Sequence, residues 1–220
     1  MTPEAFLFDM DGLLLDTERV AQATFAACAA DAGAERDAAA QFFLGLIGTS
    51  EAVTRARVAA YLPDTDIAAF AADWDAALAA RLDQYVPLRP HVAQVIPGLA
   101  AQGATMAVVT STSGARARHH LAKAGLLRHF AAVLGGDEVR ANKPDPAPYQ
   151  DAAARLGVAP TRCAAFEDSD IGVTAAVKAG CRAVQIPDLR PEDVPLPDLG
   201  QAVAPDLRAA LALFGIAVAA

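Results

Sequence analysis

Two carboxylates near the N-terminus could act together, Asp9 and Asp11 in the stretch Phe8-Asp9-Met10-Asp11-Gly12. They follow the short apolar run 5–8, which is typical of a buried strand. Residues two apart at a strand end can point to the same side, so one carboxylate could attack while the other handles a proton. Gly12 would let the chain turn sharply away. Taken alone, the pattern is weak evidence, because ordinary acidic turns share it.

Three more polar clusters follow apolar runs further along the chain. Val109-Thr110-Ser111-Thr112-Ser113-Gly114 supplies hydroxyl and backbone N–H groups at the start of a predicted helix, where phosphate binds well. Lys143-Pro144-Asp145 places an ammonium on a stiff backbone, where it could pair with a carboxylate nucleophile and a phosphate oxygen. Phe166-Glu167-Asp168-Ser169-Asp170-Ile171-Gly172 offers two adjacent acids, which suit a hard divalent cation. Alone, each cluster could be a helix cap or, for Lys143, a surface lysine.

The elements that must position these clusters alternate between strands and helices. Short apolar runs predict strands at 5–8, 105–109, 131–134, 163–166 and 183–186. Amphipathic patterns predict helices at about 91–101, 114–124, 146–156 and 170–179, each followed by a glycine suited to a left-handed cap. This alternation with short links predicts an α/β fold with a doubly wound parallel sheet. Because ligands bind outside the carboxyl ends of such strands, the four clusters can meet in one crevice.

Residues 17–87 interrupt the alternation. Three amphipathic patterns, at 17–32, 49–61 and 65–82, predict helices with no strand between them. Val86-Pro87-Leu88-Arg89-Pro90 is a stiff link back to the alternating pattern. We therefore predict a core domain of residues 1–16 and 88–220 with a helical domain of residues 17–87 inserted into it. The proline-rich, acidic region 187–197 is predicted to be a surface loop.

The bulk composition excludes some classes of protein. With 220 residues, 54% of them hydrophobic, the chain should form a well-filled globular core. The net charge of −8, without a Lys/Arg cluster, argues against nucleic-acid binding, so positive charge for an anionic substrate must be supplied locally. The acidic N-terminus, the short C-terminal apolar run and the widely spaced cysteines predict a cytoplasmic protein that does not bind membranes. No protein partner is evident.

Taken in order, the four clusters resemble those of the haloacid dehalogenase-like (HAD) superfamily. The resemblance is to its branch of phosphatases and β-phosphoglucomutase-like enzymes with a small helical cap, and it runs from Phe6 to about Asp188. It is carried by Phe8-Asp9-Met10-Asp11-Gly12-Leu13-Leu14-Leu15-Asp16-Thr17-Glu18, Val109-Thr110-Ser111, Lys143-Pro144 and Phe166-Glu167-Asp168-Ser169 with Gly172. The resemblance implies a Rossmann-like core with an inserted α-helical cap domain, and a phosphoric monoester hydrolase.

The resemblance also implies roles for the polar residues. Asp9 would be the nucleophile that forms an aspartyl phosphate, and Asp11 the general acid and base. Thr110 and the backbone of Ser111 would bind phosphate. Lys143 would steady Asp9 and the transferring group.

A Mg²⁺ cofactor is implied in the same way. It would be held by Asp9, the backbone carbonyl of Asp11 and Asp168, with Glu167 close by or bound through water. Mg²⁺ and a lysine would together remove the repulsion between an attacking carboxylate and a phosphoryl group.

The cap of such enzymes closes over the substrate and excludes water. Within residues 17–87 we expect Arg19, Gly48 and Thr49 to touch the leaving group. The substrate is expected to be a small phosphorylated metabolite, such as a phosphosugar, phosphoglycolate, a deoxysugar phosphate or a nucleotide-like monophosphate.

Three alternatives to the hydrolysis of a phosphomonoester stay open. A β-phosphoglucomutase-like enzyme would carry a histidine near Ala21 and Lys-Asn where this chain has Ser113-Gly114, so both positions favour hydrolysis. A dehalogenase is less consistent with the presence of Asp11. A non-catalytic phospho-ligand binding protein would not need the full set of acids with Lys143.

Overall fold

The computed structural model describes residues 2–47, 49, 51–190 and 194–218 of the chain. Contacts divide the chain into two compact units. The first, here called the α/β unit, comprises Met1–Asp16, Pro87–Asp188 and Leu196–Ala220. The second, the helical unit, comprises Thr17–Val86 and Leu189–Pro195. In the described part of the chain, no helix has the length and apolar character needed to cross a bilayer.

The α/β unit is built on a sheet whose strands run in the order β3-β2-β1-β4-β5-β6, with every neighbouring pair parallel. This confirms the predicted α/β fold. The strands are β1 (Ala5–Phe8), β2 (Thr105–Val109), β3 (Ala132–Leu134), β4 (Cys163–Glu167), β5 (Arg182–Gln185) and β6 (Ala202–Val203).

Strand β1 lies between β2 and β4 and is buried along its whole length. Its last residue, Phe8, is level with Val108 of β2 and Phe166 of β4. The residues that follow these three parallel strands therefore emerge at the same edge of the sheet, which is where the predicted clusters lie.

Alternate strand residues face opposite sides of the sheet. On one side, Leu7, Val109 and Ala165 pack in a core cluster with side chains of α7 (Ala147–Arg155) and α8 (Asp170–Lys178). On the other side, the ring of Phe8 stacks on that of Phe166 with centroids 5.0 Å apart. Both sides of the sheet are thus covered, as the near-continuous apolar strands require.

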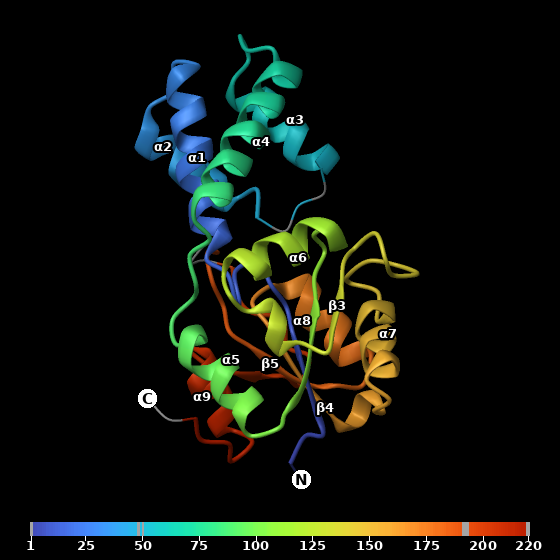
Figure 1. Ribbon diagram of the computed structural model, residues 1–220. Helices are drawn as coiled ribbons and strands as arrows, with labels where there is room; N and C mark the ends of the chain where they lie inside the picture. Colours follow the sequence, from blue (N-terminus) through green and yellow to red (C-terminus); the bar gives the residue numbers. More distant parts are fainter. Residues whose placement is uncertain (1, 48, 50, 191–193, 219–220) are drawn as a thin grey trace. The chain divides into compact units, whose positions relative to one another are not determined.

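The remaining elements of the α/β unit surround this sheet. Helix α5 (Val92–Ala101) lies against α9 (Leu207–Ala212), and Figure 1 shows both apart from α7 and α8. Helix α6 (Gly114–Lys123) follows β2, and short 3₁₀ turns precede β3 (η1, Leu127–His129) and β4 (η2, Pro160–Arg162). Neither α9 nor β6 was predicted from the sequence.

The helical unit contains α1 (Thr17–Asp31), α2 (Arg36–Leu44), α3 (Glu51–Tyr61) and α4 (Ile67–Gln84). Phe25 lies at the centre of its own core cluster, and its ring contacts those of Phe43, Phe70 and Trp74 at centroid distances of 5.7, 5.7 and 5.3 Å. This cluster gives the helical unit an apolar core of its own.

Helix α2 is an element that the sequence analysis did not predict. Its residues are rich in alanine, so the apolar periodicity is weak, and its N-cap is Glu35 rather than one of the usual short polar residues. The Glu35 carboxylate accepts hydrogen bonds from the backbone N–H groups of Asp37 and Ala38 at 2.9 and 2.6 Å. A longer acid can therefore replace the common cap.

Candidate active site

The ends of β1, β2 and β4 bring three of the four predicted clusters to one edge of the sheet. The fourth, the loop with Lys143, reaches the same place from the segment between β3 and α7. The Nζ atom of Lys143 lies 2.5 Å from Asp9 Oδ1, 2.6 Å from Glu167 Oε1 and 2.9 Å from the carbonyl oxygen of Val109. The lysine therefore joins the ends of all three strands.

Lys143 is held as a buried cation. Its side chain is only 3% exposed. Burial opposes its charge, but the carboxylates of Asp9 and Glu167 outweigh that effect and raise the pKa of the ammonium. The surface-lysine explanation is thereby excluded, since a surface lysine would be solvated.

Glu167 is fully buried and bonded through both oxygens. Oε1 accepts from Lys143 and from the hydroxyl of Tyr149, at 2.6 and 2.5 Å. Oε2 accepts from Ser169 Oγ at 3.2 Å. A β-carbon at position 172 would collide with this carboxylate, which explains why glycine stands there.

Asp9 is 7% exposed and lies among other acids. Burial raises the pKa of its carboxyl well above the ordinary value, the charges of Glu167 and Asp11 add to the rise, and Lys143 opposes it. Negative charge therefore exceeds positive charge around Asp9, and a bound cation would relieve the excess.

The donor atoms near Asp9 fit a hard divalent cation. Ligand oxygens of Asp9, Glu167 and Asp168 all lie within 4.8 Å of one another. Gly12 has a φ of 80° and passes so close to Asp168 that a β-carbon there would collide with its carboxylate. An all-oxygen, carboxylate-rich set of this kind is what Mg²⁺ prefers.

Asp11 is placed beside the end of β2. Its Oδ2 atom accepts a hydrogen bond from Thr112 Oγ1 at 2.8 Å and a longer one from Thr110 Oγ1 at 3.4 Å. Thr110 is buried, whereas the side chain of Ser111 is exposed. The predicted phosphate-binding segment and the second carboxylate are thus neighbours.

Several residues around the site were not predicted. Tyr149 and Thr112 contact the predicted residues directly, and Thr112 lies inside a cluster that the sequence analysis had already singled out. Gln185 is buried and its side-chain amide donates to Asp170 Oδ1 at 2.8 Å. A buried tyrosine or glutamine at a helix or strand position carries no local pattern that marks it as part of a site.

An ion-pair network lies where the chain leaves the α/β unit. Arg89 Nη1 lies 2.8 Å from Asp188 Oδ1 and 3.6 Å from Asp16 Oδ1. The side chains of Arg89 and Asp188 are 13% and 1% exposed. In addition, the backbone N–H of Asp16 donates to Pro87 O at 2.9 Å, so the ends of segment 17–86 are adjacent.

The predicted cap residues belong to the helical unit. Arg19 is exposed on α1. Thr49 Oγ1 donates to Leu46 O at 2.7 Å and lies 2.7 Å from Thr54 Oγ1. Gly48 falls outside the described residues. Contact of these residues with a leaving group stays a prediction.

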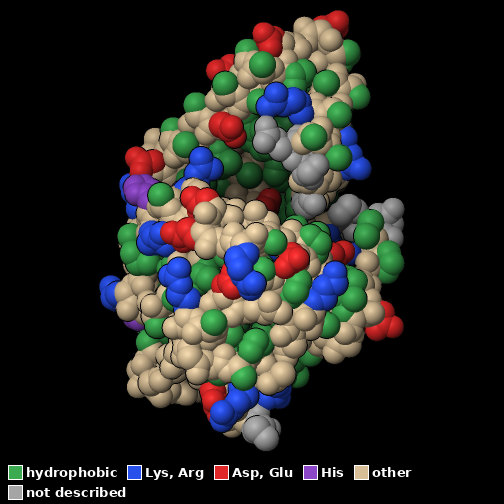
Figure 2. Space-filling view, turned by 90° about the vertical axis from the view of Figure 1, so that its right-hand side faces the viewer, with side chains coloured by type: hydrophobic (Ala, Val, Ile, Leu, Met, Phe, Trp, Pro, Cys, Tyr) green, Lys and Arg blue, Asp and Glu red, His purple; other side chains and the backbone are tan. Residues whose placement is uncertain are grey.

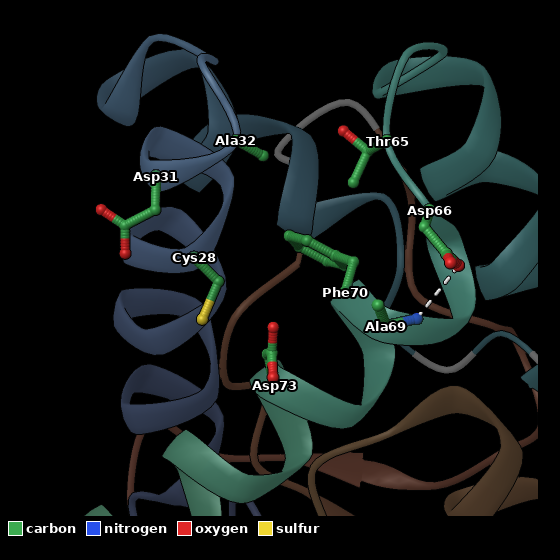
Figure 3. Close-up of a pocket in the computed structure, with 8 residues that line it drawn as sticks. All are labelled: Cys28, Asp31, Ala32, Thr65, Asp66, Ala69, Phe70 and Asp73. Carbon is green, nitrogen blue, oxygen red and sulfur yellow. Dashed lines mark hydrogen bonds between the residues drawn. The ribbon is translucent and has the colours of Figure 1, made fainter.

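The helical unit also contains a pocket of about 280 Å³ between α1 and α4. Figure 3 shows three carboxylates around it, those of Asp31, Asp66 and Asp73. Asp66 caps α4 by accepting from the backbone N–H groups of Ala68 and Ala69. An acidic lining of this kind does not suit a phosphate. More widely, Figure 2 shows Lys and Arg side chains interspersed with Asp and Glu on the face it presents, in keeping with the net charge of −8.

Similarity to known proteins extends over most of the chain. The sequence profile of a family described as haloacid dehalogenase-like hydrolase matches residues 6–186, which include all four clusters. The fructose-1-phosphate phosphatase YqaB of Escherichia coli (strain K12) is 34% identical over 180 residues, which cover 82% of this chain and 94% of that protein.

Solved structures with the same fold are also similar. A HAD family hydrolase from Deinococcus radiodurans R1, solved with bound phosphate and sodium, has a TM-score of 0.79 and 26% identity, with 97% of each chain covered. A putative β-phosphoglucomutase from Thermotoga maritima has a TM-score of 0.77 and 25% identity, with 97% of this chain and 99% of that chain covered.

Proposed function

This chain belongs to the haloacid dehalogenase-like hydrolase family, and from that premise we propose that it hydrolyses a small phosphorylated sugar or a related phosphomonoester with the help of Mg²⁺. The names of its relatives support the enzyme class, a phosphoric monoester hydrolase. A relative that covers 82% of the chain is a fructose-1-phosphate phosphatase, which supports a phosphosugar as the substrate class.

The observation that carries the proposal is the position of Lys143 between Asp9 and Glu167, at 2.5 and 2.6 Å. A carboxylate that attacks a phosphoryl group is repelled by its negative charge. A fixed ammonium in contact with that carboxylate lowers the repulsion and can bind a phosphoryl oxygen in the transition state.

The reaction would proceed in two steps. A carboxylate oxygen of Asp9 attacks phosphorus while the bond from phosphorus to the substrate oxygen breaks, and Asp11 gives its proton to the departing alkoxide. Asp11, now a carboxylate, then takes a proton from water, which attacks the aspartyl phosphate and releases inorganic phosphate and Asp9. Thr110 and the backbone of Ser111 would hold the phosphoryl oxygens throughout.

Asp9, the backbone carbonyl of Asp11 and Asp168 would hold Mg²⁺, with Glu167 close by or bound through water. When bound, the ion would neutralise charge on the transferring group. The excess of carboxylates around Asp9 and the all-oxygen donor set support this assignment.

Residues 17–87 would serve as the cap domain of a core made of residues 1–16 and 88–220, and would select the leaving group. Arg19, Gly48 and Thr49 are the proposed contacts. The runner-up is a sugar-phosphate mutase, which the likeness to a putative β-phosphoglucomutase favours. The absence of a histidine near Ala21 favours hydrolysis instead.

A panel of phosphorylated metabolites tests the proposal. We expect release of inorganic phosphate from one or more phosphosugars, dependent on Mg²⁺ and abolished by EDTA. Asp9→Asn should abolish it, whereas Asp198→Asn, at an exposed aspartate of the same unit, should not. Conversion of a sugar phosphate into its isomer without net phosphate release would establish the mutase instead. Tight ligand binding without turnover by the wild type would establish a non-catalytic binding protein.

A further inference from the structure

We propose that Thr112 is a positioning residue that holds the carboxylate of Asp11 for proton transfer. This inference rests on the proposed function, because it concerns the acid and base of that reaction. The hydroxyl of Thr112 donates to Asp11 Oδ2 at 2.8 Å, shorter than the 3.4 Å bond from Thr110 to the same oxygen.

The backbone of Thr112 is fixed on both sides. Its N–H donates to Thr110 Oγ1 at 3.1 Å, and its carbonyl oxygen accepts from the backbone N–H of Gly136 at 3.0 Å. At position 136 a β-carbon would collide with the carbonyl oxygen of Ser111, so glycine allows this close approach. A donor with a fixed backbone therefore faces Asp11.

The bond also fixes the orientation of the Asp11 side chain. A hydroxyl donor held at 2.8 Å from Oδ2 restricts rotation of the carboxylate plane, so Oδ1 is fixed in position as well. Thr112 would thus aim the acid at the leaving oxygen without touching the substrate.

Leaving groups of different basicity distinguish this role from a merely structural one. An alkoxide needs a proton as it departs, whereas p-nitrophenolate does not. For Thr112→Val, which keeps the shape but removes the donor, kcat/KM toward an alkyl phosphate should fall roughly 10- to 100-fold, within the range of general acid catalysis. For the same variant, kcat/KM toward p-nitrophenyl phosphate should change by no more than about threefold, because p-nitrophenolate departs without needing a proton.

Three companion measurements complete the experiment. Thr112→Ser keeps the donor and should restore the alkyl phosphate rate. Thr105→Val makes the same substitution at the first residue of β2 and should leave both rates unchanged. The inhibition constant of inorganic phosphate should be the same in wild type and Thr112→Val, since Thr112 is not assigned to phosphate binding. Should Thr112→Val fail to fold, Thr112→Ala removes the same donor with a smaller side chain.

The outcomes separate the inference from the proposed function. Equal losses toward both substrates, or weaker inhibition by phosphate, would refute the positioning role of Thr112 while the hydrolase stands. Unchanged rates in all variants would refute it too. A wild type that hydrolyses neither substrate with Mg²⁺ would refute the proposed function and the inference with it.

Discussion

Lys143→Met removes the cation between two buried carboxylates and keeps an unbranched side chain of similar length. In the wild type, Nζ lies 2.5 Å from Asp9 and 2.6 Å from Glu167, and the side chain is 3% exposed. Loss of one such placed donor to a transition state costs about 3 to 4 kcal/mol, so kcat/KM should fall about 10²- to 10³-fold.

The same variant should also unfold more easily at neutral pH. Removing one partner of a buried ion pair lowers the free energy of unfolding by about 3 to 5 kcal/mol, because the remaining charges are left buried. Burial already raises the pKa of Asp9 in the wild type, and Lys143 opposes that rise, so the pKa should be higher still in the variant.

The sign of the pH dependence follows from that shift. A carboxyl whose pKa is raised on folding favours the folded state when protonated, and its stabilising contribution is lost as pH rises through the folded-state pKa. The stability difference between wild type and Lys143→Met should therefore be largest at neutral pH. It should shrink as pH falls toward the ordinary carboxyl pKa of 3.8, where Asp9 is protonated in both proteins.

Two assays measure these effects. Steady-state kinetics with saturating Mg²⁺ at pH 7 gives kcat/KM, and urea unfolding at neutral and acid pH gives the stability difference. The matched control is Lys178→Met, at an exposed lysine at the end of α8, which should change stability by no more than about 0.5 kcal/mol. Turnover of Lys143→Met within a few-fold of wild type would refute the lysine's proposed role. A stability difference that grows at acid pH would refute the electrostatic reasoning.

Further expectations concern stability, metal and thiols. Asp9→Asn should not lower the Tm of the metal-free protein at pH 7, because burial raises the pKa of Asp9, which makes its ionised form costly there, and because Lys143 keeps its ion pair with Glu167; scanning fluorimetry would contradict this by showing a clear drop. Mg²⁺ at about a hundred times its Kd should stabilise the wild type by about 2.7 kcal/mol, and an unchanged Tm would count against a metal site. Arg89→Met should lower the free energy of unfolding in urea by about 3 kcal/mol, because it leaves the buried carboxylate of Asp188 without this partner. A change below about 1 kcal/mol would show that the ion pair between Arg89 and Asp188 does not stabilise the fold as expected. Burial raises the pKa of Cys163 to about 11 and of Cys181 to about 12, so iodoacetamide at pH 8 should alkylate both far more slowly in the folded than in the urea-unfolded protein, and equal rates would contradict this.

Sequence patterns predicted those parts of the fold that rest on strong periodicity. The apolar runs that became β1, β2 and β4 are short and fully or mostly buried, and each is bounded by polar residues. By contrast, β6 has only two residues and both are exposed, so no apolar run marks it. Its pairing with β5 is set by tertiary contacts that no local pattern contains.

The residues of the candidate site likewise include some that a sequence pattern marks and some that it does not. Asp9, Lys143 and Glu167 could be singled out because carboxylates and a lysine after strands suggest chemistry, and the structure brings them into contact. Tyr149 could not, since an aromatic residue on a helix is ordinarily a core residue. Its contacts with Glu167 and Lys143 are seen in the structure alone. Thr112 stood within a predicted cluster but had no signal of its own.

The adjacency of Asp16 and Pro87 has an evolutionary consequence. A backbone hydrogen bond of 2.9 Å joins them, and a second, from Arg89 N–H to Leu14 O at 3.0 Å, lies beside it. An insertion whose two ends touch can be lengthened, shortened or exchanged without stretching the sheet, and the entropy of closing a longer loop grows only slowly with its length. Residues 17–86 can therefore diversify while Asp9 stays where it is. Under the proposed function, the selection of the leaving group and the phosphoryl chemistry would then be inherited as separate modules.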